Sequence, residues 1–405
     1  MRTIIPMILR NRKISVNDER KESRGNIIDF KTRRKKPPTN PRDLPALSGY
    51  RIEGVFSGSF LQKLLKFARV LIPKNSANPA FKTVRFSGQN GFSAVVTDLE
   101  NMAEVKADRD EGRGRGTVLI PFGLLSRIYK AKPRHIRFWT ENGQGYVGYE
   151  SQGISRKEKF RVIPLEEYPD TRVPSKGFKQ IDCNLAAYIQ EASTFTADPA
   201  NKIATCGVLL DGVKNRIVGT DGKRLYCRDK IPLSVSERII IPPNKVLQYL
   251  DADSCSVLRN DRILWIKSGV TTLGLMVMEG TFPDYEKVLK FDLNPYKTIW
   301  KISPKDRKTL VKLLPSLAYE KKEVPALNLK FNKDRLSLHT GKGGAGEFRT
   351  LVYGSTECRV NAAYFRDILK VEDIQECRLS DGANKPIVFN GKRGVEMLLM
   401  PLMET

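Results

Sequence analysis

The chain has 405 residues, of which 70 are Lys or Arg and 45 are Asp or Glu, so its formal net charge at pH 7 is +25. This excess is larger than solubility requires and favours a polyanionic partner. The hydrophobic content of 40% excludes wholesale disorder, and no apolar run reaches the roughly 18 residues that a membrane span needs. We therefore expect a soluble, cytoplasmic protein with roughly two to four domains.

The first 48 residues differ in composition from the rest. A run of four basic residues and two prolines, residues 33–38, lies among polar residues, with no helical or alternating pattern. This composition predicts a disordered, basic N-terminal arm at residues 1–48. One interpretation of the arm is a tether that touches nucleic-acid phosphates. The alternative is a solvated tail or a misassigned start of the chain. The sequence does not separate these interpretations.

From Tyr50 onward the chain shows a repeat of about 120 residues, found three times. Each unit opens with apolar residues at the i, i+3, i+4, i+7 spacing of one helical face. The three sets are Leu61, Leu64, Leu65 and Ala68, then Leu185, Tyr188, Ile189 and Ala192, then Leu310, Leu313, Leu314 and Leu317. This spacing predicts a similar amphipathic helix at the start of each unit.

A second helix is predicted about 60 residues later in each unit. Its apolar residues are Leu124, Leu125 and Ile128, then Val246, Leu247 and Leu250, then Tyr364, Phe365 and Ile368. Pro121 and Pro242 stand near the first turn of two of these helices, where a missing N–H costs nothing, and Asn361 can cap the third.

Between the helices the chain alternates or is rich in β-forming residues, and Gly, Asn and Asp separate these segments. Examples are residues 83–86, 93–96, 136–139, 215–218 and 327–331. The Thr-Asp pair at Thr97 recurs at Thr220, and the aromatic-Pro-Asp segment at Tyr168 recurs at Phe282. We infer three α+β units, each with antiparallel sheet and two helices on one face.

Basic residues lie opposite the apolar face of several predicted helices. In the first unit these are Lys63, Lys66 and Arg69; in the third they are Lys305, Lys308 and Lys312; the second helices add Arg127, Lys130, Arg366 and Lys370. Charge runs are usually solvated faces, which is the alternative here. Because four of six equivalent helices share the pattern, we predict non-specific, salt-dependent contact with duplex phosphates.

Signals of catalysis and of metal binding are weak. The six cysteines are far apart with no CxxC pair, which indicates buried free thiols in a reducing compartment rather than a zinc site. The segment Gly341–Gly346 matches GxGxxG, but β-rich residues follow it, so a glycine-rich hairpin is preferred to a dinucleotide cradle. His135 and His339 lack an evident nucleophile partner. We expect no enzyme activity, cofactor or metal.

Three features together resemble the bacterial DNA polymerase III beta subunit, or sliding clamp, family over residues of about 50–405. They are the tandem repeat, the TDGKRL segment with the GTFPDYEKVL segment (Thr220–Leu225 and Gly280–Leu289), and the terminal Leu398–Leu402. The resemblance implies clamp domains at 49–174, 175–292 and 293–405, with antiparallel sheets outside and two helices per domain lining a ring. The basic arm is unmatched.

The resemblance also implies the function. Clamps are non-catalytic processivity factors that close as head-to-tail homodimers around double-stranded DNA, in the cytoplasm and on the nucleoid. The DNA-facing residues implied here are Lys63, Lys66, Arg69, Lys74, Arg127, Lys130, Lys305, Lys308, Lys312, Arg366 and Lys370. Lys74 stands next to a loop that lacks the arginine expected there.

Clamps also bind short apolar peptides of the replicative polymerase, the clamp-loader ATPase and repair proteins. Carried over by position, the peptide-binding pocket would consist of Thr205, Thr220, Gly222, Lys223, Arg224, Leu225, Pro283, Lys287, Val288, Leu398, Met400, Pro401 and Leu402. The alternative for residues 398–402 is an ordinary terminal core strand. Lys223 and Thr205 replace a histidine and an aliphatic residue of the family, which implies a different peptide preference.

At the dimer interface the family pairs basic residues of the first domain with acidic residues of the third. Phe160 and Val162 would supply its apolar part, whereas the stretch Glu320–Glu323 is mixed in charge. The second interpretation of the chain is therefore a nucleic-acid-binding relative that does not close a ring, such as a viral or plasmid-borne accessory protein. A third is an enzyme with a cryptic carboxylate site.

Overall fold

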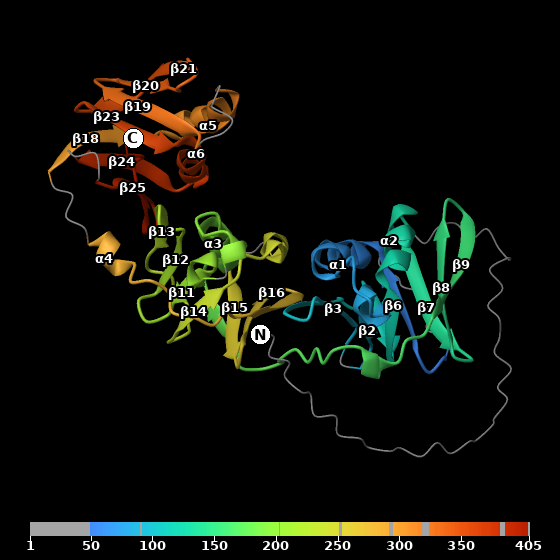
Figure 1. Cartoon of the computed structure of the whole chain (residues 1–405). Helices are drawn as coiled ribbons and strands as arrows, with labels where there is room; N and C mark the ends of the chain where they lie inside the picture. The colour runs from blue at the N-terminus through green and yellow to red at the C-terminus, as the bar shows by residue number, and fades with distance from the viewer. Residues whose placement is uncertain are drawn as a thin grey trace. The chain divides into compact units, whose positions relative to one another are not determined.

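The computed structural model describes residues 49–89, 91–201, 203–250, 253–290, 295–317, 324–380 and 385–403 (Figure 1). The predicted arm at residues 1–48 and the stretch Glu320–Glu323 lie outside the described residues. Every strand pairing within the described ranges is antiparallel. The predicted fold class, α+β with tandem antiparallel units, is confirmed.

The first unit begins with strand β1 (Glu53–Ser57), which runs directly into helix α1 (Gly58–Leu71). The Ser57 side chain accepts a hydrogen bond from the Phe60 N–H and so caps the helix. The elements that follow are β2 (Thr83–Ser87), β3 (Ser93–Thr97), β4 (Asn101–Lys106), β5 (Gly112–Arg115), β6 (Thr117–Pro121), α2 (Phe122–Lys130), β7 (His135–Glu141), β8 (Gln144–Ser151) and β9 (Ile154–Arg161). Short 3₁₀ turns lie at Pro79–Lys82 and Leu165–Glu167.

The second unit repeats this order without a counterpart of β5, with a 3₁₀ helix in place of α2 and with an added short helix at its end. Its elements are β10 (Lys179–Ile181), α3 (Leu185–Ser193), β11 (Val208–Asp211), β12 (Arg216–Thr220), β13 (Arg224–Arg228), β14 (Arg238–Ile241), η5 (Lys245–Tyr249), β15 (Cys255–Asn260), β16 (Ile263–Ser268), β17 (Thr271–Met276) and α4 (Glu286–Leu289), with 3₁₀ turns at Pro199–Asn201 and Ala204–Cys206. The predicted second α-helix is a five-residue 3₁₀ helix, η5, capped by Asn244. A segment this short favours the tighter i→i+3 hydrogen bonds, and it still buries Val246 and Leu247.

The third unit contains β18 (Tyr296–Lys301), α5 (Pro304–Leu313), η6 (Leu314–Ser316), β19 (Ala326–Asn332), β20 (Arg335–His339), β21 (Ala345–Arg349), β22 (Leu351–Tyr353), β23 (Thr356–Asn361), α6 (Ala362–Lys370), β24 (Ile374–Ser380), β25 (Ile387–Gly391) and β26 (Val395–Leu399). Ser303 and Asp306 form a capping box at the start of α5. The helix ends at Leu313, short of the predicted Leu317, because Pro315 has no N–H to continue it. The predicted glycine-rich hairpin is confirmed between β20 and β21.

Two of the four sheets continue from one unit into the next. The eight-stranded sheet has the order β10-β15-β16-β17-β4-β3-β2-β6, so β17 of the second unit pairs with β4 of the first. The nine-stranded sheet has the order β14-β11-β12-β13-β26-β25-β24-β18-β22, so β13 of the second unit pairs with β26 of the third. The remaining sheets, β5-β1-β7-β8-β9 and β21-β20-β19-β23, belong to the first and third units alone.

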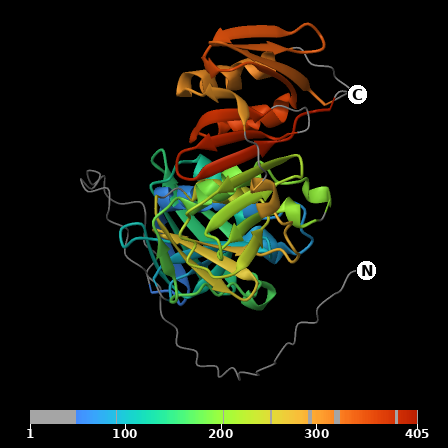
Figure 2. The same ribbon diagram turned by 90° about the vertical axis from the view of Figure 1, so that its left-hand side faces the viewer.

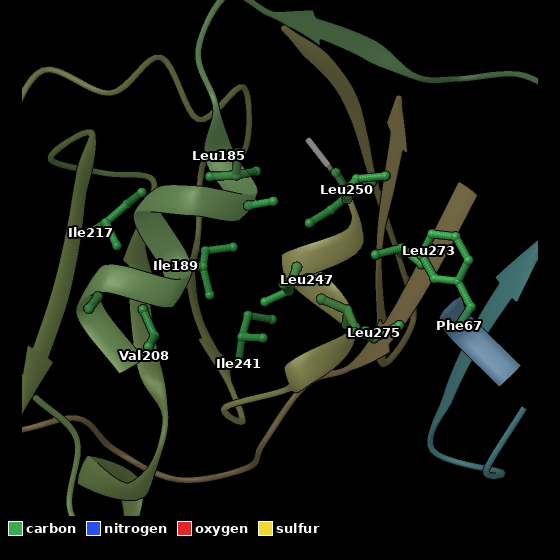
Figure 3. Close-up of a cluster of buried hydrophobic side chains, with 14 of the residues drawn as sticks. Phe67, Leu185, Ile189, Val208, Ile217, Ile241, Leu247, Leu250, Leu273 and Leu275 are labelled. Carbon is green, nitrogen blue, oxygen red and sulfur yellow. The ribbon is translucent and has the colours of Figure 1, made fainter. Parts of the chain in front are cut away.

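Each unit buries its helices against its own strands. In the second unit Leu185 and Ile189 of α3 and Leu247 of η5 point into one apolar cluster, which Phe67 of α1 extends (Figure 3). In the third unit Figure 2 shows α5 and α6 between two layers of strands, drawn in orange and red. The rings of Phe365 in α6 and Phe389 in β25 are 6.2 Å apart, which ties the helix to one of these layers.

A buried arginine reinforces the contact between the second and third units. Arg228 on β13 is fully buried, and its guanidinium lies 2.8 Å from Glu191 of α3 and 2.8 Å from Asp373, which follows α6. Its Nε donates to the Tyr226 hydroxyl at 2.8 Å, and the group stacks on the Tyr188 ring at 4.0 Å. A charge so deeply buried is tolerated only because each donor has a partner.

We expect Arg228→Met to lower the free energy of unfolding by about 3 kcal/mol, because it leaves two poorly solvated carboxylates without their cation. Urea denaturation followed by circular dichroism measures this change. Arg172→Met, at a solvent-exposed ion pair with Asp170, is the matched control and should leave the midpoint unchanged. Equal midpoints for the two variants would contradict the role given to Arg228.

Candidate functional sites

Helices pack side by side within each unit and between the first and second units. Helix α1 contacts α2 and η5, η5 contacts α3, and α5 contacts α6. The edge-to-face contact of Phe67 with Tyr249, 5.8 Å between ring centroids, joins α1 of the first unit to η5 of the second. Because the apolar face of each helix is used for packing, its polar face is left for solvent or for a partner.

Most of the predicted DNA-facing cations lie on this polar face. Lys66, Arg69, Lys74, Arg127, Lys130, Lys305, Lys308, Lys312 and Lys370 are exposed, and Lys63 and Arg366 are half-buried. The prediction that these side chains point away from the helical cores is therefore confirmed. That they touch DNA stays a prediction.

Several of these cations are neutralised within the chain. Lys63 lies 2.9 Å from Glu111, Arg127 lies 2.8 Å from Glu158, and Lys370 lies 2.8 Å from Asp367. By contrast, Lys305, Lys308 and Lys312 of α5 have no carboxylate partner within 4.0 Å in the described part of the chain. Helix α5 therefore carries the strongest unpaired positive charge of the helical surfaces, whereas α3 offers only Gln190 and a Glu191 already bound to Arg228.

A second candidate site is an apolar patch where the second and third units meet. Strand β13 directs alternate side chains to opposite faces, and Leu225 pairs in register with Leu398 of β26. A separate buried cluster forms on this side: Leu209, Val218, Leu225, Cys227, Ile240, Phe282, Tyr285, Val388 and Leu398, with Ala204, Met278, Leu289 and Tyr296 packed against it. Four large apolar side chains are exposed nearby in the sequence: Ile203, Val288, Met400 and Met403.

The predicted pocket residues separate into groups. Thr220, Leu225 and Leu398 are buried; Thr205, Pro401 and Leu402 are half-buried; Gly222, Lys223, Pro283, Lys287, Val288 and Met400 are exposed. The turn before β13 is rigid, since the Thr220 hydroxyl donates to the Arg224 carbonyl at 2.7 Å and accepts from the Gly222 N–H at 3.1 Å. Gly222 has a φ of +85°, which favours glycine there. The Met400 N–H donates to the Lys223 carbonyl at 2.9 Å, which brings the terminal segment to this turn.

Arg224 does not contribute its side chain to this patch, although it was predicted as a residue of the pocket. Its guanidinium lies on the opposite face of β13, 3.1 Å from Asp221 and 2.8 Å from Asp367, and stacks on the Tyr364 ring at 4.1 Å. The reason is strand parity: residues 224, 226 and 228 face the helices, whereas Leu225 and Cys227 face the patch. Met278 and Val388, by contrast, were missed, although Val388 faces Leu398 in the register of β25 and β26.

Phe160 and Val162, predicted at a dimer interface, lie at or beside the edge strand β9. Phe160 is buried in the core of the first unit, and its ring covers Gly145, where a Cβ would come within 2.4 Å of it. Val162 is half-buried. Phe160 therefore packs within its own chain, and β9 presents mainly backbone and charged side chains along its edge.

The cysteines are all free, as predicted, and four of the six are buried. Burial raises the pKa of the Cys227 thiol to about 12 and that of Cys183 to about 11. A raised pKa is the opposite of what a nucleophilic cysteine needs. No helix in the described ranges is both long and apolar enough to cross a membrane.

Comparisons with known proteins agree with this architecture. The chain is 25% identical over 327 residues to the beta sliding clamp homolog GriR of Streptomyces muensis, covering 75% of this chain and 84% of that protein. Its structure matches the DNA polymerase sliding clamp of Bacillus subtilis with a TM-score of 0.72 at 15% identity, covering 88% of this chain and all (100%) of that one. No family model matches the sequence.

A third match is the DnaN sliding clamp (DNA polymerase III subunit beta) of Pseudomonas aeruginosa, solved bound to griselimycin. It superimposes with a TM-score of 0.73 at 20% identity and covers 87% of this chain and 100% of that one. The chain thus has the fold of the bacterial DNA polymerase III beta subunit, and its sequence relatives are beta sliding clamps.

Proposed function

We propose that this chain is a non-catalytic DNA polymerase processivity factor, which closes as a head-to-tail homodimer around duplex DNA and holds a polymerase on it. The observation that carries the proposal is the repeat of sheet junctions along the chain. Strand β4 of the first unit pairs with β17 of the second unit. In the same way, β13 of the second unit pairs with β26 of the third. Strands β17 and β26 hold equivalent positions, because each is the last strand of its unit.

The same repeat identifies the strands that would join two copies. In the third unit the equivalent of β4 and β13 is β21, and in the first unit the equivalent of β17 and β26 is β9. Both are edge strands of their sheets. An open edge offers unpaired N–H and C=O groups, so β21 of one copy can pair with β9 of another as the internal junctions do. A head-to-tail contact made twice between two copies closes on itself.

Duplex DNA fits the helical surfaces by charge. The cations of α1, α2, α5 and α6 bind phosphates without reading bases, and contacts of this kind can be exchanged as a ring moves along the duplex. In this role the ring stays attached by encircling DNA more than by affinity, in the cytoplasm and on the nucleoid.

The apolar patch would serve as the peptide-binding site. Exposed Val288 and Met400 beside the buried Leu225 and Leu398 can bury apolar anchors of a short peptide, which suits tails of a replicative polymerase, a clamp-loader ATPase or repair proteins. The exposed Lys223 on its rim favours a peptide with an acidic residue.

The second candidate is a nucleic-acid-binding relative that does not close a ring. It is favoured by the charges of the edge strands. Strand β9 carries Arg156, Lys157, Lys159 and Arg161, whereas β21 offers only Glu347, which already lies 3.3 Å from Arg335. A seam between two copies would therefore depend on backbone hydrogen bonds with few ion pairs.

Replacing Lys66, Lys305, Lys308 and Lys312 with Gln should weaken duplex binding. The slope of log K against log salt should fall by roughly 0.9 for each phosphate that the variant no longer neutralises. Fluorescence anisotropy of a labelled duplex at several salt concentrations measures this slope. The control replaces four exposed lysines outside the helices, Lys176, Lys214, Lys330 and Lys333, with Gln. Equal slopes for the two variants would refute the helical surface.

Ring closure is tested by retention on DNA. After loading by a clamp loader, a closed ring should remain on a nicked circle through gel filtration and should be released once the circle is cut. Analytical ultracentrifugation of the free chain gives the second measurement, since one chain has a mass of 45.8 kDa. Equal retention on circular and linear DNA, with a single-chain mass at micromolar concentration, would favour the non-ring candidate.

Replacing Val288 and Met400 with Ser should abolish the stimulation of primer extension by the replicative polymerase. The protein should stay folded, because both side chains are exposed. Val213→Ser with Leu351→Ser, which removes two exposed apolar side chains elsewhere, is the matched control. Full stimulation by the Val288/Met400 variant would rule out the apolar patch as the tethering site.

A further inference from the structure

The outer face of the β5-β1-β7-β8-β9 sheet has a composition that neither the helices nor the apolar patch share. Phe56, Phe138, Val147 and Phe160 point from this sheet into the core. The alternate positions form two rows on the other face. By register, one row is Arg115, Glu53, Trp139, Tyr146 and Lys159, and the next is Arg113, Val55, Arg137, Gly148 and Lys157. Aromatic and basic residues thus dominate this face.

The aromatic rings of this face are stacked on one another. The centroids of Trp139 and Tyr146 are 5.5 Å apart with planes 19° from parallel, and those of Tyr50 and Trp139 are 6.2 Å apart at 20°. The Lys157 ammonium is 4.1 Å from the Tyr146 centroid and 5.1 Å from the Trp139 centroid. At these separations the near-parallel rings are stacked with an offset, and the Lys157 ammonium lies against two of them.

Gly148 leaves room on this face for the indole of Trp139, because it has no side chain. A Cβ at Gly148 would lie 3.2 Å from the six-membered ring of Trp139, so the indole rests on the glycine backbone. Trp139, Tyr146 and Tyr50 are all half-buried, and the long side chain of Lys157 covers the outer faces.

Cations outnumber carboxylates on this face, where Glu141 and Glu150 are the exposed acidic residues of β7 and β8. Its one central carboxylate, Glu53, is fully buried and is held by Arg115 at 3.4 Å and Arg137 at 3.3 Å. Around the rings the exposed cations are Arg113, Arg115, Lys157, Lys159 and Arg161. A ligand that covers the platform meets several ammonium and guanidinium groups at once.

We propose that this face, the residues Tyr50, Trp139, Tyr146, Lys157 and Lys159 on the outer side of the sheet, binds single-stranded nucleic acid. Bases stack on the outer faces of Trp139 and Tyr146, and Lys157 moves from the rings to a phosphate. Aromatic platforms set among cations are the general solution for binding single strands without sequence preference. A duplex does not fit, because its base faces are occupied by each other, and an acidic peptide offers charge without planar rings.

The site does not depend on ring closure or on the helical cations, so it would persist in a single chain. Binding would place a single strand on the opposite side of the sheet from the core and helices of the first unit. Single-stranded DNA and RNA share the chemistry that the face recognises, and the two are separated below by direct comparison.

The chain has its own reporter for this contact. Of its three tryptophans, Trp265 and Trp300 are buried with exposed fractions of 2% and 0%, whereas Trp139 is accessible. We expect the tryptophan emission of the full chain to be quenched on titration with dT20, with affinity falling as salt rises. An abasic strand of the same length should bind at least about tenfold more weakly, because it has phosphates without bases. An RNA U20 strand shows whether the sugar matters.

Two variants separate stacking from charge. Tyr146→Ala should weaken dT20 binding by about tenfold or more at constant salt slope, and Lys157→Gln with Lys159→Gln should reduce the slope. Lys330→Gln with Lys333→Gln is the matched control. Because Tyr146 is partly exposed, we expect circular dichroism to show that the Tyr146→Ala variant is folded. If that variant is unfolded, the lysine variant still tests the proposal.

Three results would overturn the proposal: no quenching by dT20, equal affinity for the abasic strand, or unchanged binding in both variants. Tight binding of a 20-bp duplex that competes fully with dT20 would also overturn the proposal, because the face would then recognise phosphates and not bases. The DNA-binding surface of the helices is tested separately, because Lys66, Lys305, Lys308 and Lys312 are intact in every variant used here.

Discussion

Main-chain pairing across unit boundaries holds this molecule together. Strand β17 pairs with β4, and β13 pairs with β26, over five residues in each case, and these ladders merge half-sheets of successive units. Hydrogen bonds between strands need no particular side chains, so the same junction can be formed by dissimilar residues: Thr271, Thr272 and Leu273 at one, and Arg224, Leu225 and Tyr226 at the other. This freedom explains how repeated units of very different sequence keep one architecture.

Strand β13 shows how one segment can serve two surfaces. Arg224 and Arg228 point toward the helices, where carboxylates of two units neutralise them. Leu225 and Cys227 point the other way, into the apolar cluster beneath the candidate peptide site. Because period-two alternation separates the two faces, a substitution at Leu225 changes the apolar cluster and leaves the ionic contact between the units in place.

The sequence predicted the repeat, the first helix of each unit, the strands quoted from each unit and the outward direction of the helical cations. Periodicity carries this information, because a buried helical face must recur at i, i+3 and i+4. It did not predict that η5 is a 3₁₀ helix or that α5 ends at Leu313, since both depend on local hydrogen bonding near prolines.

Side-chain contacts between units were harder to foresee. Arg224 was assigned to the wrong face of β13. The resemblance indicates where a residue lies along the chain, but it does not say to which face of the strand the side chain points. Within the first unit, the stacked pair of Trp139 and Tyr146 was also missed, because these residues come from different strands and only the strand register brings them together.

The two open edge strands also bear on how the protein avoids uncontrolled assembly. A head-to-tail surface that fails to close generates chains of indefinite length, and unpaired strands are the usual starting points for such growth. Strand β9 carries four basic residues in eight positions, which repel a parallel copy of the same strand. The cationic edge therefore disfavours edge-to-edge pairing between two β9 strands.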